Sequence, residues 1–175
     1  TTPATSPAPA TAPTAAASLG SGPPTATIRA PVITRHAGSF HGRKVAYTAT
    51  VDGIDVADAQ GRHGARVVAF AYTADAVAGR KVVPAQRPVM FFFNGGPIVA
   101  SPYLHLGAYG PRRVEFPEDP QAEPFTWTLR DNPHSLLDVA DLVFIDPAGT
   151  GFSRVAPGKD PRDYWSIVAD GQQVS

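Results

Sequence analysis

A short apolar run in this chain ends in residues that suit the stabilisation of negative charge. The run from Val89 to Phe93 is followed by Asn94-Gly95-Gly96-Pro97, and its dense apolar character predicts a strand buried on both faces. The two glycines let the backbone turn sharply and approach a ligand closely, because no Cβ obstructs it. A backbone N–H at such a turn can meet the charge that develops on a carbonyl oxygen during acyl transfer. An ordinary strand followed by a Gly-Pro turn is the alternative interpretation.

A second segment repeats this organisation. Asn132-Pro-His-Ser135 precedes a predicted buried strand from Leu142 to Ile145, which is followed by Asp146-Pro-Ala-Gly-Thr-Gly-Phe-Ser153. Together the two segments resemble the serine carboxypeptidase family of the α/β-hydrolase fold. That family carries Asn-Gly-Gly-Pro-Gly after one core strand and Asp-x-Pro-x-Gly-x-Gly-Phe-Ser after a later one. The resemblance covers roughly residues 40 to 175 and has the form of bacterial members.

The resemblance implies roles for three residues of the first motif. Gly96 corresponds to the backbone N–H donor of the oxyanion hole, and Asn94 and Gly95 correspond to groups that bind the terminal carboxylate of the substrate. An amide side chain and an N–H can hold a carboxylate without a formal positive charge. The alternative for Asn94 is a residue that only caps the local backbone of the turn.

Two departures from the family pattern bear on these roles. Ile98 stands where the family has glycine, and a β-branched residue is strained if that position requires a positive φ. Ala108 stands before Tyr109-Gly110-Pro111, where many members have a glutamate that helps to bind the substrate carboxylate. Without this glutamate, the sequence does not predict a strict preference for a free C-terminus.

The catalytic nucleophile of this fold is a serine on a Gly-x-Ser-x-Gly turn, followed along the chain by Asp and His. The sequence contains no such motif, and Ser153 lacks the second glycine, so we do not take Ser153 as the nucleophile. By resemblance, the triad lies beyond the helix that we expect near the end of the chain. We therefore expect the N-terminal part of an α/β-hydrolase mixed sheet, with antiparallel hairpins at its edge, truncated before the nucleophile elbow and inactive on its own.

Composition limits the possible partners. The formal net charge of +0 gives no basis for binding nucleic acid, and no apolar run reaches the roughly 18 residues of a membrane helix. Cysteine is absent, which excludes disulfides and thiolate metal sites. We expect a peptide substrate, no cofactor, no metal and no integral membrane segment. The predicted function is that of a serine-type carboxypeptidase; the alternatives are an esterase or acyl-transferring hydrolase, or a secreted binding module without catalytic activity.

The chain divides into two parts. Residues 1–27 contain only Thr, Pro, Ala, Ser, Gly and Leu, without charge, which is typical of a disordered linker. They are either a spacer behind a removed export signal or a tail without a role, and with the first interpretation we expect a secreted or periplasmic protein. Residues 28–175 form the predicted hydrolase-like domain.

Local signals predict the remaining elements. Strands are expected at residues 44–51 and 66–72, with a hairpin turn at Asp52-Gly53. Residues 101–133 are predicted to be mostly loop, with a helical turn near Leu104. A helix is predicted from an Asp160 N-cap and Pro161 to the end of the chain.

Several other polar residues receive structural interpretations. We interpret His36 and His41 as exposed side chains rather than metal ligands, and His105 as a structural or solvent-facing histidine close to the predicted site. Asp146 is predicted to order the glycine-rich turn through its carboxylate. Arg112 and Arg113 are interpreted as a solvated pair.

Overall fold

The computed structural model describes residues 30–58, 60–94, 99–117, 119, 121, 127–164, 166, 168 and 171. The linker predicted at residues 1–27 lies outside this part of the chain, as do Gly95, Gly96 and Ile98. None of the helices in the described part is long and apolar enough to cross a membrane.

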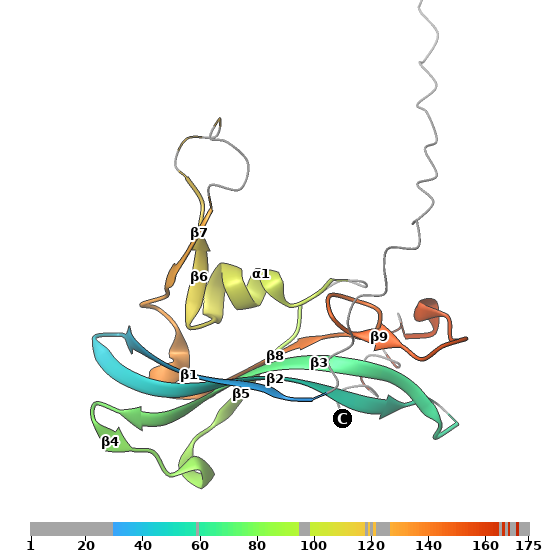
Figure 1. The fold of residues 1–175 in the computed structure, drawn as a ribbon, viewed down its shortest axis with the longest axis horizontal. Helices are drawn as coiled ribbons and strands as arrows, with labels where there is room; N and C mark the ends of the chain where they lie inside the picture. Colours follow the sequence, from blue (N-terminus) through green and yellow to red (C-terminus); the bar gives the residue numbers. More distant parts are fainter. Residues whose placement is uncertain are drawn as a thin grey trace, which may run out of the picture.

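The fold is α/β and is dominated by one mixed sheet (Figure 1), as the sequence predicts. Its strands run in the order β1-β2-β3-β8-β5, and the short strands β4 and β9 also pair with β3. All pairs are antiparallel except β5 with β8, which are parallel. The bounds are β1 Val32–Phe40, β2 Arg43–Ala57, β3 His63–Val77, β4 Arg80–Lys81, β5 Val89–Phe92, β8 Asp141–Asp146 and β9 Arg154–Val155.

The hairpin turn predicted at Asp52-Gly53 is wrong, because β2 continues through both residues. Gly53 lies opposite Val68 of β3, and the side chain of Arg66 covers the space where a Cβ of Gly53 would lie. Two long paired strands gain more from their continuous ladder than a local turn signal offers. The predicted strands therefore belong to longer strands, β2 and β3.

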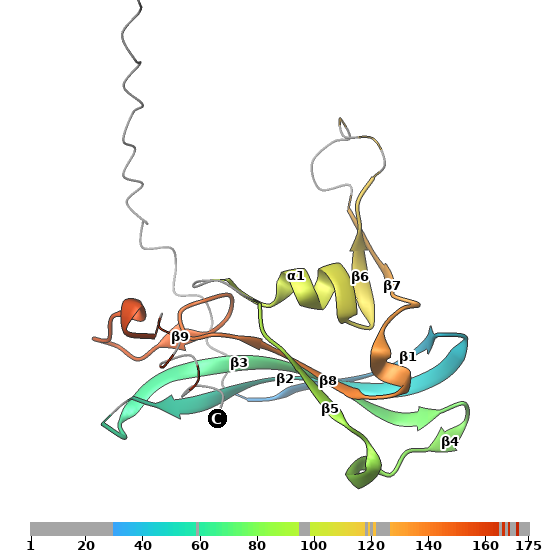
Figure 2. The same ribbon diagram turned by 180° about the vertical axis from the view of Figure 1, so that it is seen from behind.

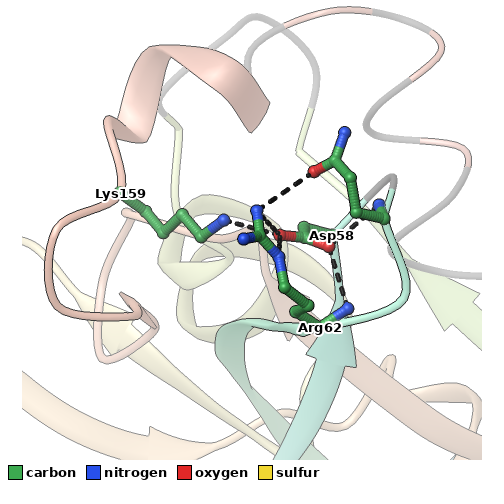
Figure 3. Close-up of polar contacts among 4 residues, drawn as sticks. Asp58, Arg62 and Lys159 are labelled. Carbon is green, nitrogen blue, oxygen red and sulfur yellow. Dashed lines mark hydrogen bonds and ion pairs between the residues drawn. The ribbon is translucent and has the colours of Figure 1, made fainter.

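The turn between β2 and β3 forms instead at Asp58. The Asp58 carboxylate accepts hydrogen bonds from the backbone N–H groups of Gln60 and Arg62, each at 2.9 Å. It also binds the Lys159 ammonium at 2.5 Å and the Arg62 guanidinium at 3.2 Å (Figure 3). These contacts hold the pKa of the Asp58 carboxyl well below its usual range, with the Lys159 hydrogen bond as the largest cause. Asp58 thus joins the tip of the hairpin to a loop far along the chain.

One face of the sheet is covered by a short helical segment. Helix α1 (Pro102–Leu104) continues into the π-helix η2 (His105–Tyr109) over this face, and a hairpin of β6 (Arg112–Glu115) and β7 (Thr128–Asp131) projects away from it (Figures 1 and 2). The helical turn near Leu104 is confirmed, but the hairpin was not predicted. The core between these layers consists of Phe40, Val45, Tyr47, Ala74, Val77, Phe92, Leu137, Ala140, Leu142 and Phe144.

The two strands that carry the motifs, β5 and β8, differ in how far they are buried. Strand β8 is buried along most of its length, as predicted for Leu142 to Ile145. The expectation that residues 89–93 are buried on both faces is wrong, since Phe91 is 59% exposed and only Phe92 of β5 is buried. Successive side chains of a strand point to opposite faces of the sheet, so Phe91 lies on the open face whereas Phe92 packs in the core.

A second, smaller apolar cluster lies near β9. It consists of Ala65, Val67, Ala69, Ile145, Ala148 and Tyr164, the last of which belongs to the 3-10 helix η4 (Pro161–Tyr164). The Asp160 carboxylate accepts the Arg162 N–H at 2.9 Å, as expected of a capping residue. Beyond Tyr164 only Ser166, Val168 and Gly171 are described, so the longer helix stays a prediction. The other 3-10 helices are η1 Pro84–Gln86 and η3 Leu136–Asp138.

Candidate functional site

Two strands that carry the sequence motifs end at the same edge of the sheet. Strands β5 and β8 are parallel and in register from Val89 with Asp141 to Phe92 with Phe144. Both strands therefore end at the same edge of the sheet, where Asn94 lies just past β5 and Asp146 is the last residue of β8. The carboxyl ends of parallel strands are where ligands bind in open α/β sheets, which makes this edge the candidate functional site.

Two buried polar atoms at this edge have no hydrogen-bond partner within the described part of the chain. They are Oδ1 of Asn94 and Oγ of Ser101. A polar atom that is buried without a partner costs free energy, and such atoms are uncommon in folded proteins. Of the three predicted site residues, only Asn94 can be placed; Gly95 and Gly96 lie outside the described residues. Ser101 was not recognised as part of the site in the sequence.

Asp146 holds the loops that follow the two strands. Its Oδ1 accepts the backbone N–H of Ser101 at 2.8 Å, and its Oδ2 accepts the N–H of Phe152 at 3.0 Å. The prediction that Asp146 orders the glycine-rich turn is confirmed by the Phe152 contact, whereas the link to Ser101 was missed. Gly151 adopts φ +48°, and a Cβ there would overlap the Asp146 carboxylate, so the turn needs glycine at this position.

Ser153 serves the structure of this turn. Its side chain is completely buried; Oγ donates to the carbonyl oxygen of Asp146 at 2.5 Å and accepts the N–H of Val68 at 2.7 Å. The hydroxyl is thus engaged both as donor and as acceptor. This geometry agrees with the interpretation that Ser153 is not a nucleophile.

Asn132 and Ser135, from the segment before η3, hold the end of the helical layer. Asn132 Nδ2 donates to the carbonyl oxygens of Ala108 at 2.7 Å and Gly110 at 2.9 Å. Ser135 Oγ donates to the carbonyl oxygen of Tyr109 at 2.9 Å. Both side chains are buried, so this motif fixes the position of η2 over the sheet. Ala108 takes part through its backbone.

His105 is the first residue of η2, and its buried side chain packs against the sheet. Its ring stacks on Phe144 with centroids 4.6 Å apart, and Nε2 lies 2.6 Å from the hydroxyl of Tyr72. Burial lowers the pKa of His105 to about 4, although the charge of Asp146 opposes this shift. Burial also raises the pKa of Tyr72 to about 12. His105 is therefore neutral at pH 7 and has the structural role that the sequence suggested.

The remaining polar candidates lie away from this edge. His36 is exposed, and the exposed His41 pairs with Asp138 at 3.2 Å. Arg112 and Arg113 are exposed, and Arg112 pairs with Asp131. No group of three or more His, Cys, Asp or Glu side chains that could hold a metal ion occurs among the residues that the structure describes.

Comparison with known proteins gives one family. The family model described as serine carboxypeptidase matches residues 75–169 of the chain. This range contains both motifs, from Asn94 through Asp146 to Ser153. No curated protein matches the chain.

Proposed function

Because the chain belongs to the serine carboxypeptidase family, we propose that it provides part of a peptidase that removes residues from the C-terminal end of peptides. One observation carries this proposal: Asn94 follows β5 at the edge of the sheet where β8 also ends, so its amide lies where the carboxyl ends of the two parallel strands meet. The antiparallel strands β1 to β3, followed by the parallel pair of β8 and β5, also support an α/β-hydrolase sheet.

The proposed roles at this edge are those of binding and charge stabilisation. The two N–H donors of the Asn94 amide and the N–H of Gly95 hold the terminal carboxylate of the peptide. The N–H of Gly96 donates to the oxyanion that forms when the scissile carbonyl is attacked. A donor of this kind acts more strongly on the developing oxyanion than on the ground-state carbonyl, so it serves the chemical step rather than binding.

The nucleophile of the proposed reaction is not among these residues. The sequence has no Gly-x-Ser-x-Gly motif, and the hydroxyl of Ser153 is held by Asp146 and Val68. We therefore propose that these residues precede the nucleophile elbow in the fold and do not turn over substrate alone. A chromogenic acyl ester tests this directly: turnover that disappears in Ser153→Ala would make Ser153 the nucleophile and would refute the assignment.

Carboxylate binding can be tested on the chain itself. The probes are N-acetyl-phenylalanine and its amide, titrated into isotope-labelled protein and followed by NMR. We expect the acid to bind the wild-type chain and to lose about tenfold in affinity in Asn94→Ala, because hydrogen bonds to charged groups contribute about 1.5–3 kcal/mol. The amide should be affected little by this substitution.

A matched control is Gln86→Ala, which removes an exposed amide side chain in η1, before β5 begins. It should leave both titrations unchanged. Equal effects of Asn94→Ala on the acid and the amide would mean that Asn94 only shapes its turn. In that case an esterase or a binding module without catalytic activity becomes the better interpretation.

We also propose that the protein acts outside the cytoplasm. The uncharged, proline-rich composition of residues 1–27 supports a spacer between an exported anchor or signal and the folded domain. Fractionation of the native cells, followed by detection of the chain, tests this proposal; recovery only with the cytoplasmic fraction would contradict it.

A further inference from the structure

We propose that an open groove at one end of the sheet binds a ligand that combines an apolar chain with a carboxylate. The groove lies where β1 and β3 end and where β2 and β4 begin (Figure 1). Strand β3 runs antiparallel to β8, so this end of the sheet is opposite to the end at which Asp146 completes β8. The groove is therefore separate from the candidate peptidase site, and neither site depends on the other.

A row of alanine side chains forms the base of the groove. Ala37 of β1 lies opposite Ala46 of β2, which in turn lies opposite Ala76 of β3. Paired residues of neighbouring strands point to the same face of a sheet, so the three methyl groups lie side by side. Val45 and Val77, which adjoin this row in β2 and β3, are buried in the core. The row therefore lies on the face of the sheet that points away from this core.

A bulge in β3 adjoins the row and affects the shape of this face. The pairing of β2 with β3 shifts after Ala46, which leaves Asp75 as the extra residue of β3. Such a bulge bends its strand and increases the local twist. The groove has a volume of about 560 Å³, which is within the range of small-molecule sites. Its lining includes Gly38, Ser39 and Gly79, so no large side chain fills it.

Three cations share this face of the sheet. Lys44 lines the groove, and Lys81 of β4 pairs with Ala76 and so projects from the same face. Arg35 lies two residues before Ala37 in β1, which also places it on this face. Among the residues that the structure describes, none of the three cations forms an ion pair.

The carboxylates beside the groove do not balance this charge. Asp131 also lines the groove, but its Oδ1 lies 3.6 Å from the Arg112 Nε. Asp75 accepts a hydrogen bond from the Thr48 hydroxyl at 2.9 Å and is the one carboxylate of the two without a cation partner in the described part of the chain. The charge around the groove is consequently positive, which is complementary to a carboxylate.

The dimensions of the row favour a slender apolar chain. Adjacent strands lie about 4.8 Å apart, so a row across three strands is about 10 Å long. An extended decyl chain covers this length and removes the alanine methyl groups from water. The stems of Lys and Arg side chains can pack against such a chain while their charged ends reach its carboxylate. The groove thus fits a medium-chain carboxylate such as decanoate.

The experiment titrates decanoate into isotope-labelled protein and follows the NMR signals of Ala37, Ala46 and Ala76. Decyltrimethylammonium keeps the apolar chain but reverses the charge, and acetate keeps the carboxylate without the chain. We expect decanoate to shift these alanine signals, to bind about tenfold more tightly than either comparison compound, and to weaken as salt is added. The signals of Phe144 report on the core and should stay unchanged.

Two pairs of variants locate the site. Ala46→Phe fills the groove and should weaken decanoate at least about tenfold, whereas Thr50→Phe, on the same face of β2 but outside the groove, should not. Lys44→Gln should weaken decanoate about threefold, as expected for one exposed charge. Its control is Arg113→Gln, which removes an exposed cation of β6 and should have no effect. If Ala46→Phe does not fold, Ala46→Leu fills part of the same space.

Several results would overturn the proposal. Wild type that does not bind decanoate refutes it without any variant. Equal affinity for decanoate and decyltrimethylammonium would mean that only apolar contact is involved, and an unchanged affinity in Lys44→Gln would contradict the charge argument. Signal shifts centred on Phe91, or equal losses in Ala46→Phe and Thr50→Phe, would place the ligand elsewhere on the open face of the sheet.

Discussion

Truncation of Phe144 tests the central packing of the sheet. Its side chain is 0% exposed and lies against three aromatic rings: Phe92 and His105, each with centroids 4.6 Å from its own, and Tyr72 at 6.1 Å. Replacing a buried Phe with Ala typically destabilises a protein by about 3–5 kcal/mol. The ring pairs exclude the lower end of that range, so we expect a loss of about 4 kcal/mol.

Phe91→Ala provides the matched control. Phe91 is the same residue type on the adjacent strand, but it points to the other face and is 59% exposed. Full burial of such a side chain contributes about 1.5–3 kcal/mol, so less than half burial corresponds to about 1 kcal/mol. Phe144→Ala should therefore lower the free energy of unfolding about four times as much as Phe91→Ala, although the same atoms are removed.

Urea unfolding, followed by circular dichroism, measures both variants. With an m-value of about 2 kcal/mol/M, Phe144→Ala should lower the midpoint by about 2 M and Phe91→Ala by about 0.5 M. If Phe144→Ala is unfolded without urea, Phe144→Leu gives a smaller loss in the same direction. Equal losses at Phe144 and Phe91 would refute the argument, because they would show that the open face of β5 is covered in solution.

Four further predictions concern polar groups. The pKa of His105 is about 4, below its usual value, so the unfolded state binds the proton first; stability should fall by about 3 kcal/mol as the pH drops from about 6.5 to 4, and this slope should be missing in His105→Gln. The pKa of the Asp58 carboxyl is lowered in the folded state, so its ionised form stabilises the fold, and this stabilisation is lost as the pH falls. Asp58→Asn should therefore lower Tm at pH 7, and the difference in Tm from wild type should narrow as the pH falls below about 4. Arg87→Met should cost about 3 kcal/mol, because it leaves Asp141 buried without its ion partner, and adding Asp141→Leu should restore part of this loss in thermal unfolding. Ser153→Ala should cost about 1–3 kcal/mol in urea unfolding through the lost buried contacts; an unchanged midpoint would show that the hydroxyl contributes nothing.

The sequence predicts the parts of the fold where strong local patterns agree with the tertiary contacts. The apolar run at Leu142 to Ile145 forms a buried strand because β3 and β5 flank it on both sides. Asp146 orders the following turn because its carboxylate is close enough to reach the Phe152 N–H. In both cases the sequence pattern that predicts the feature lies within a few consecutive positions, even though β3 and β5 come from remote parts of the chain.

The missed features depend on contacts that are remote in sequence. Asp52-Gly53 has a strong turn signal, but pairing with β3 keeps these residues in a strand. The apolar run at Val89 to Phe92 is too short to reveal that it ends the order of paired strands. The hydrogen bond from Ser101 to Asp146 joins residues 45 positions apart, and no local pattern indicates it.

The position of β8 also determines when the sheet can form as the chain is synthesised. Strand β8 lies between β3 and β5 in space but follows both in sequence. Strands β1 to β3 can pair as soon as they emerge from the ribosome, whereas β5 must wait for residues 141–146. About 50 residues separate the two strands, which corresponds to roughly 3–10 s of translation. During that interval Val89, Phe91 and Phe92 have no strand partner among the described elements, so this apolar segment is prone to aggregation until β8 has been synthesised.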